Sequence, residues 1–389
     1  MNPRRFLLTL LVLCTSLLAA CSPALPPSIT SGYPGEDEAV VRKVVAEGAK
    51  PIPQNRSVTP YQTLSVELMT GRASGQVVDA EAEFGAVAQT RFRAGDRVLV
   101  QQVGAADGSG LRWVVVDAVR LPTLYLLAAA FVALVLWVGR GRGVTSILGL
   151  VVSFAVVLFG VLPLLVSGAD PLLVSTGASC VILVTTLYLA HGFNRRTSVA
   201  AAATALVLVG GGLLSLLAVD IAKLGGGATE ESVYLQSVLP GVRLDLRGML
   251  QAGILIALLG ILDDVTIGQA AVVFTLRSVN PALRASQLYG KAMEVGREHI
   301  ASLVNTLVLA YTGVSLPLLL LLTASDIPIA AALNREVVAT EVVRTLVGSI
   351  ALVAAVPVTT FLAAQVAVRS PAGPAPGPDA GGHVHLHTP

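Results

Sequence analysis

The segment from Met249 to Leu276 is apolar and long enough to cross a lipid bilayer, yet two adjacent carboxylates, Asp263 and Asp264, lie near its middle. A membrane-spanning helix needs about 20 apolar residues. A charged side chain at that depth costs several kcal/mol and is therefore rare outside functional sites. The fold must make that cost tolerable, either by enclosing the aspartates among other helices or by placing them at the water boundary.

Small residues recur at helical spacing around Asp264, whereas Asp263 is turned about 100° away on the same helix. The stripe that shares the face of Asp264 consists of Gly253, Ala257, Gly260, Gly268 and Ala271. The next apolar segment repeats this design with Glu298, Ser302, Asn305, Thr306, Ala310, Gly313 and Pro317. Membrane helices approach each other closely along such stripes. We therefore expect Asp264 to meet Asn305 and Thr306 inside a helix bundle.

The candidate polar core of this bundle is the set of side chains that could bind a small solute or ion within the membrane. Its members are Asp263, Asp264, Thr266, Gln269, Asn305 and Thr306. Intramembrane carboxylates beside glycines are typical of transport sites. In the structural alternative, the aspartates are ordinary helix-end charges in contact with water, and the amide side chains only join helices.

The same region resembles the YibE/F family of polytopic bacterial membrane proteins. The residues that carry the resemblance read DDVTIGQA, then NPAL with RASQLYGKAMEVGREHIAS, then NTLVLAYTGVSLPLLLL. The similarity runs from about Val40 to Val366 and is strongest over Gly260 to Leu322. The resemblance implies an architecture of several membrane spans behind an extracytoplasmic head, and it implies no biochemical activity.

The composition is that of a membrane protein, with 54% hydrophobic residues, 13% charged residues and a mean hydropathy of +0.76. The net charge of +2 and the absence of long basic clusters argue against nucleic acid as a partner. Cys14, Cys21 and Cys180 are too few and too scattered for a disulfide framework or a thiolate metal site. No metal or cofactor is expected.

The N-terminal residues 1–20 have the layout of a secretory signal sequence, with Arg4 and Arg5 before a short apolar core. Leu18 to Cys21 resembles a bacterial lipobox, in which Cys21 would be acylated after cleavage. The alternative is an uncleaved signal-anchor helix from Phe6 to Ala20. Either arrangement places the following residues outside the cytoplasm. Residues 21–35 are rich in Pro, Ser and Gly and are typical of a linker.

Residues 36–120 are predicted to form a small extracytoplasmic β-domain, either a barrel or a sandwich. Alternating apolar residues predict strands at Leu64–Leu68, Arg97–Gln101 and Trp113–Val116. Turns that contain glycine are expected at Thr70–Gly75 and Gly104–Gly110. The domain either packs on the membrane part or binds a ligand.

Residues 121–367 are predicted to form an α-helical membrane domain of about seven spans. The apolar runs are Leu121–Val138, Val144–Val166, Pro171–Ala190, Ser198–Val219, Met249–Leu276, Ile300–Thr323 and Val342–Ala367. Arginine and lysine are more frequent in the loops that would face the cytoplasm, where the Pro281–His299 segment is expected to form an amphipathic helix. We therefore expect a multi-pass protein of the bacterial inner membrane, with its head outside and its C-terminus in the cytoplasm.

The tail at residues 368–389 has the composition of a disordered segment. His383, His385 and His387 alternate there, so metal binding is the alternative to an unstructured end. His191, in the sequence HGFNRRTS, is expected to be a loop residue that faces water.

The sequence favours a permease-like protein that moves a small solute, ion or proton. The rival hypothesis is a scaffold or sensor, in which the head binds something outside and the Pro281–His299 helix reports inside. The expected partners are the lipid bilayer and an unknown small solute or ion, and a second copy of the chain or another membrane protein is left open. No enzyme is expected, because nucleophile elbows, Walker loops and zinc-binding His-Glu-x-x-His helices are absent from the sequence.

Overall fold

The computed structural model describes residues 35–51, 58–83, 91–104, 110–239, 242, 244–324 and 327–369. The signal sequence, Cys21 and the histidines of the tail lie outside the described residues, so the hypotheses about them stay predictions. The chain divides into two compact units, of which one ends at Val138 and the other begins at Gly139.

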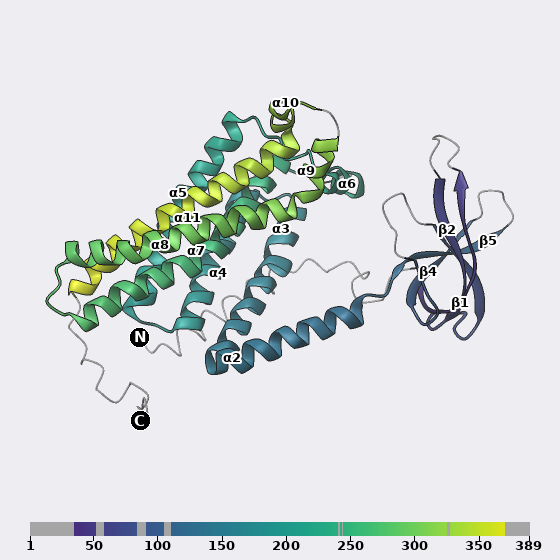
Figure 1. Cartoon of the computed structure of the whole chain (residues 1–389), viewed down its shortest axis with the longest axis horizontal. Coiled ribbons are helices and arrows are strands. Elements are labelled where there is room, and N and C mark those ends of the chain that lie inside the picture. The colour runs from purple at the N-terminus through teal and green to yellow at the C-terminus, as the bar shows by residue number, and fades with distance from the viewer. Residues whose placement is uncertain are drawn as a thin grey trace, which may run out of the picture. The chain divides into compact units, whose positions relative to one another are not determined.

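The strands of the first unit form a closed barrel with the order β1-β2-β3-β5-β4 (Figure 1). Neighbouring strands are antiparallel except β3 and β5, which pair in parallel. The strands are β1 Glu36–Pro51, β2 Val58–Leu68, β3 Val77–Glu83, β4 Arg97–Gly104 and β5 Leu111–Ala118. The prediction of a small N-terminal β-rich domain is confirmed, and the closed sheet makes it a barrel.

Alternating side chains fill the barrel, because every second residue of a strand points to the same face. The residues of β2 and β4 that belong to the core cluster alternate along the strands, and they are Leu64, Val66, Leu68, Val98 and Val100. Ser65 and Leu99, between them, are also buried. The alternation is the pattern from which those two strands are predicted. Such an alternation does not predict the long strand β1. Register shifts between Val41 and Lys43 and between Val44 and Ala46 interrupt the alternation in this strand.

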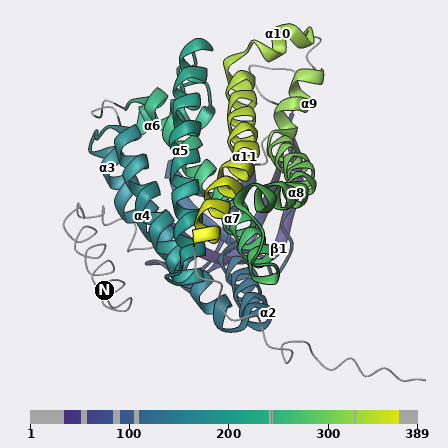
Figure 2. The same ribbon diagram turned by 90° about the vertical axis from the view of Figure 1, so that its left-hand side faces the viewer.

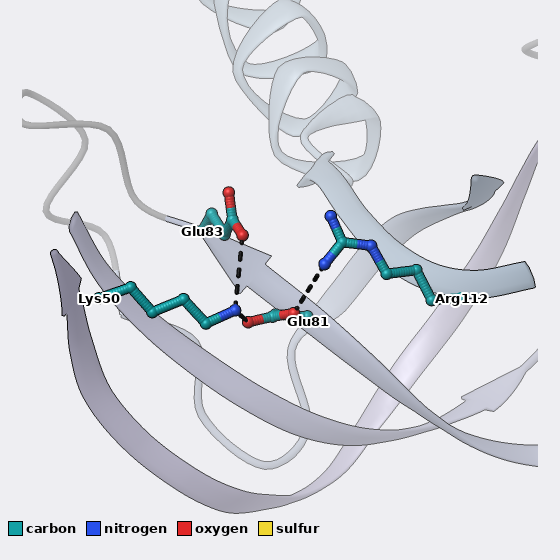
Figure 3. Close-up of polar contacts among 4 residues, drawn as sticks. All are labelled: Lys50, Glu81, Glu83 and Arg112. Atoms are coloured by element: carbon teal, nitrogen blue, oxygen red, sulfur yellow. Dashed lines mark hydrogen bonds and ion pairs between the residues drawn. The ribbon is translucent and has the colours of Figure 1, made fainter. Parts of the chain in front are cut away.

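Charged side chains join β1, β3 and β5 on the barrel surface (Figure 3). Glu81 forms an ion pair with Lys50, and its Oε2 lies 3.2 Å from Nη1 of Arg112. Lys50 Nζ also lies 3.7 Å from Oε1 of Glu83 and 4.9 Å from the centre of the Tyr61 ring. The hydrogen bond to Glu81 raises the pKa of Lys50 above its ordinary value. Because these groups are exposed, each pair contributes at most about 1 kcal/mol to stability.

The second unit is a helix bundle with α7, Leu246–Val279, at its centre, where it contacts α4, α5, α8 and α11. The other helices of this unit are η2 Val157–Val161, α3 Leu162–Val166, α4 Pro171–His191, α5 Arg195–Ile221, α6 Glu230–Val238, α8 Ala285–Val314, α9 Leu316–Ala324, α10 Ile329–Leu333 and α11 Glu336–Arg369. Figure 2 shows α11 between α5 and α8, and it contacts both.

The helix α2, Leu121–Val156, leads from the first unit into the second and has a break at Arg140, where φ is 50° and ψ is −132°. With η2 and α3 it makes an apolar stretch of 46 residues. A straight helix of that length would extend about 70 Å, more than twice the thickness of a bilayer core. The break falls between the runs Leu121–Val138 and Val144–Val166, which the sequence predicts as separate spans.

The described residues include five helical stretches that are long and apolar enough to span a membrane, or six if α8 and α9 form one span bent by 63°. This confirms a helical membrane domain with several spans. The break in α2 accounts for the difference from the predicted number of about seven, because the two runs on either side of Arg140 belong to one of these stretches.

The connection between α7 and α8 differs from the prediction, which starts a helix at Pro281. Asn280 instead ends α7, and its side-chain oxygen accepts a hydrogen bond from the backbone amide of Ala282 at 3.1 Å. Arg277 donates to the carbonyl oxygens of Pro281 and Leu283, which holds the turn closed. Helix α8 therefore begins at Ala285, and it continues without interruption into the next apolar segment.

Close packing around α7 depends on small residues of a neighbouring helix. A Cβ atom added at Gly211 of α5 would lie 2.9 Å from Leu258, and one at Gly212 would lie 3.0 Å from Leu255. Added Cβ atoms on the stripe of α7 would meet no described atom within 4 Å at Gly253, Gly260 and Gly268. The prediction that this stripe packs against another helix is wrong. Large side chains of α7 pack closely against the glycines of α5 instead, and such van der Waals packing drives the association of membrane helices.

Candidate functional site

A cavity of about 630 Å³ lies between the second half of α2, η2, α4 and α7. Most of the side chains around it are apolar, as in typical small-molecule sites. Its polar lining includes Thr145, Ser153, Thr186, His191, Asp263 and Asp264. The cavity thus brings together residues from three segments that are separated in the sequence.

Asp263 is the more enclosed of the two aspartates. Its Oδ2 accepts a hydrogen bond of 3.0 Å from the hydroxyl group of Thr186 on α4. Its Oδ1 is buried and has no hydrogen-bond partner among the described residues. Among those residues, no cationic side chain forms an ion pair with Asp263. A buried oxygen of a charged group that lacks a partner is costly, so it needs a compensating proton, ion or solute.

Asp264 and His191 lie at the exposed side of the same cavity. His191 is the last residue of α4 and lies within electrostatic range of Asp264, Arg142 and Arg196. The sequence predicts an exposed histidine but gives no sign that it shares a cavity with the aspartates. The available signal is the four-residue spacing of Thr186 and Ala190 on α4, which puts both on the face that lines the cavity but has meaning only once α4 is known to contact α7.

Thr266 and Gln269 are buried, but they join helices instead of lining the cavity. The hydroxyl groups of Thr266 and Thr204 lie 2.7 Å apart, which connects α7 with α5. The amide nitrogen of Gln269 donates to Thr360 Oγ1 at 2.7 Å and to the carbonyl oxygen of Ala292 at 3.0 Å. These hydrogen bonds connect α7 with α11 and α8. Of the predicted polar core, only the two aspartates line the cavity.

The family model for YibE/F-like proteins matches residues 127–369, which is more than half of the chain. The chain belongs to the YibE/F-like family. The match covers every helix that lines the cavity, and it begins after the barrel. No curated protein and no solved structure matches the chain. Family membership therefore confirms the resemblance seen in the sequence and leaves the activity to be argued from the cavity.

In this YibE/F-like protein, Asn305 and Thr306 do not meet Asp264, contrary to the prediction. Both lie on an exposed face of α8, where Thr306 donates a hydrogen bond to the carbonyl oxygen of Ser302 in its own helix. Helix α8 packs against α7 and α11 through a different face. The buried residues of that face are Leu288, Ala292, Met293 and Gly296.

The chemistry of the YibE/F-like cavity is that of carboxylates, hydroxyl groups and one imidazole. Among the described residues, no group of three His, Cys, Asp or Glu side chains is arranged to hold a metal ion. The side chains present can accept and donate protons, form hydrogen bonds with a polar solute, or balance one positive charge.

Proposed function

We propose that this YibE/F-like protein is a permease that moves a small solute or ion across the membrane through the cavity beside Asp263. The observation that carries the proposal is Asp263 itself, which lines a cavity among helices long and apolar enough to span a bilayer and whose buried Oδ1 has no hydrogen-bond partner among the described residues. A carboxylate at that depth is costly unless its charge is balanced. A transported ion or solute would supply that balance.

The comparison with the other buried polar residues of α7 supports a functional role for Asp263. The hydroxyl group of Thr266 and the amide nitrogen of Gln269 have partners on neighbouring helices, as expected for side chains that stabilise the bundle. Asp263 has one partner and one unpartnered oxygen, and it faces open space. Hydroxyl groups such as those of Ser179 and Ser215 are also buried without a partner, but Asp263 is the carboxylate among the described residues in that state, and an unpartnered carboxylate costs more than an unpartnered hydroxyl group.

The proposed orientation places the barrel outside and the C-terminus in the cytoplasm of a bacterial inner-membrane protein. Arg142 and Arg196 lie near His191 at the exposed side of the cavity. Positively charged residues favour the cytoplasmic side of a membrane protein. His191 and the two arginines would then lie at the cytoplasmic end of their helices.

The proposal is tested by an uptake and efflux screen in proteoliposomes with purified wild-type protein, the Asp263→Asn variant and the Asn305→Ala variant. Asp263→Asn keeps the shape of the side chain and removes its charge, so we expect it to fold and to lose transport. Asn305→Ala is the control, since Asn305 is remote from the cavity, and it should transport as the wild type does.

A folded Asp263→Asn variant that transports at the wild-type rate would contradict the permease mechanism. If neither variant changes the phenotype of a deletion strain and no solute moves, the scaffold or sensor hypothesis would be favoured. In that case the continuous helix from Ala285 into the membrane domain is the segment to test for transmission of a signal.

A further inference from the structure

The hydroxyl group of Thr186 has two close acceptors, and a third, the carbonyl oxygen of Leu183, at 3.5 Å, but only one hydrogen to donate. Its Oγ1 lies 2.8 Å from the carbonyl oxygen of Ile182 in its own helix and 3.0 Å from Oδ2 of Asp263. A hydroxyl group can donate once, although it can accept as well. A single hydrogen can be shared between the two acceptors only in a weaker three-centre bond, so both contacts are fully satisfied when one of these partners donates to Thr186.

A protonated Asp263 resolves this conflict, because its carboxyl group then has a hydrogen to donate. The Oδ2–H group would donate to Oγ1 of Thr186, and Thr186 would donate to the carbonyl oxygen of Ile182. The remaining Oδ1 would be a neutral carbonyl oxygen. Leaving a neutral acceptor without a partner costs less than leaving a charged one. An ionised Asp263 would compete with Ile182 for the single hydrogen of Thr186 and would keep an unpartnered charged oxygen.

No other described group near Asp263 would neutralise the negative charge of its ionised form. Asp264, on the same helix, adds a second negative charge. The other titratable or charged groups nearby are His191 from α4, Arg142 from α2 and Arg196 from α5, and they interact with one another at the exposed side of the cavity. None of these three forms an ion pair with Asp263 within the described part of the chain. A metal ion would also need several ligands that converge on one point, and no group of three His, Cys, Asp or Glu side chains does so among the described residues.

We propose that Asp263 carries a proton in this conformation and that a proton is the transported or coupled ion of the permease. The acceptor of the Thr186 hydroxyl group depends on the protonation state of Asp263. Thr186 donates to Ile182 when Asp263 is protonated, and it donates to Asp263 when the proton leaves. The hydrogen bond between α4 and α7 changes direction with the proton. The exposed imidazole of His191 can exchange protons between water and the cavity. The coupling of the proton to transport rests on the proposed function. The bound proton rests on the geometry alone.

The test measures the bound proton without requiring transport. Purified full-length protein in detergent is treated with dicyclohexylcarbodiimide, which reacts with protonated carboxyl groups in apolar surroundings, and the modified peptide is identified by mass spectrometry. We expect modification at Asp263, a loss of modification as the pH is raised, and no modified α7 peptide in Asp263→Asn. Infrared difference spectra between acidic and alkaline buffer should show a protonated carboxyl band that Asp263→Asn removes and Asp264→Asn retains.

The variants at Thr186 test the hydrogen-bond exchange. Thr186→Ser keeps the hydroxyl group, so its carboxyl band should resemble that of the wild type, whereas Thr186→Val removes the partner and should shift the band. Equal bands in both variants would contradict the proposed exchange.

Four outcomes separate this inference from the proposed function. Modification at Asp264 instead of Asp263 would overturn the bound proton at Asp263. Protection by Na⁺ at constant pH would show that Na⁺ displaces the proton, which would overturn the proton as the coupled ion and leave a permease with another ion. A pH-dependent carboxyl group at Asp263 in a protein that transports nothing would retain the bound proton and overturn the permease. Proton movement into proteoliposomes that is lost in Asp263→Asn would support both.

Discussion

Thr186 and Asp263 are 77 residues apart in the sequence and form a hydrogen bond of 3.0 Å between α4 and α7. This bond joins a helix at the edge of the cavity to the central helix of the bundle. It connects the side chain of Asp263 to another helix, and the second carboxyl oxygen of Asp263 is buried without a partner among the described residues. The stability and the function of the protein should therefore respond differently to the loss of this carboxylate.

We expect Asp263→Asn to be at least as stable as the wild type, because the substitution removes a buried ionisable group and retains a side chain that can accept from Thr186. Asp263→Ala should be less stable than Asp263→Asn by about 1 kcal/mol or more, since Thr186 then loses a partner. Thermal unfolding in detergent measures both. Equal destabilisation by the two substitutions would mean that the charge itself stabilises the fold.

The contact of α8 with α7 and α11 should depend on Gly296 but not on Gly313. A Cβ atom at Gly296 would lie 2.6 Å from Cγ1 of Val356 and 3.0 Å from the amide nitrogen of Gln269. Gly296→Ala should therefore lower the free energy of unfolding by about 1–3 kcal/mol. Gly313→Ala is the matched control, because no described atom lies within 4 Å of its added Cβ, and alanine favours a helix. A variant Gly296→Ala as stable as Gly313→Ala would contradict this packing.

The pKa of Lys50 is raised, first because its ammonium group donates to Glu81. The stabilisation from this pair should be present below the ordinary pKa of 10.5 and should be lost as the pH rises through the higher folded value. At a mildly alkaline pH, Lys50 should react more slowly with an amine-acylating reagent than it does in a Glu81→Gln variant. Mass spectrometry of the labelled peptides measures the two rates, with exposed Lys43 as the internal control. Equal rates at Lys50 would contradict the pairing.

The orientation of the membrane domain can be tested by labelling engineered cysteines from outside intact cells. Ser167 and Ser286 are suitable positions, since both are exposed and they lie at opposite predicted sides of the membrane. The background should carry Cys180→Ser, because Cys180 is a free and exposed thiol. We expect Ser167→Cys to react with an impermeant maleimide and Ser286→Cys to react only after permeabilisation. Strong labelling of Ser286→Cys in intact cells would contradict this orientation and indicate the opposite one.

The sequence by itself determined the class of this protein and the existence of both units. Long apolar runs can only be accommodated in a bilayer, and a strict alternation such as that of Leu64–Leu68 has only one stable solution, a strand with one buried face. It also determined that a carboxylate lies within a membrane span, because the charge of Asp263 and Asp264 contrasts with the apolar residues around them. The family resemblance depended on the same short motifs.

Only the tertiary structure decided which aspartate is enclosed and what it contacts. Helical spacing shows that Gly260, Asp264 and Gly268 share one face, but it does not show which face packs against neighbours. The helix α7 turns its large side chains inward, against the glycines of α5, so the small-residue stripe is left exposed and Asp263 is the residue directed at α4. The sequence does not predict Thr186 as the partner of Asp263 either. A hydrogen bond between helices depends on how each helix is rotated and shifted along its axis, and the packing of the whole bundle sets both.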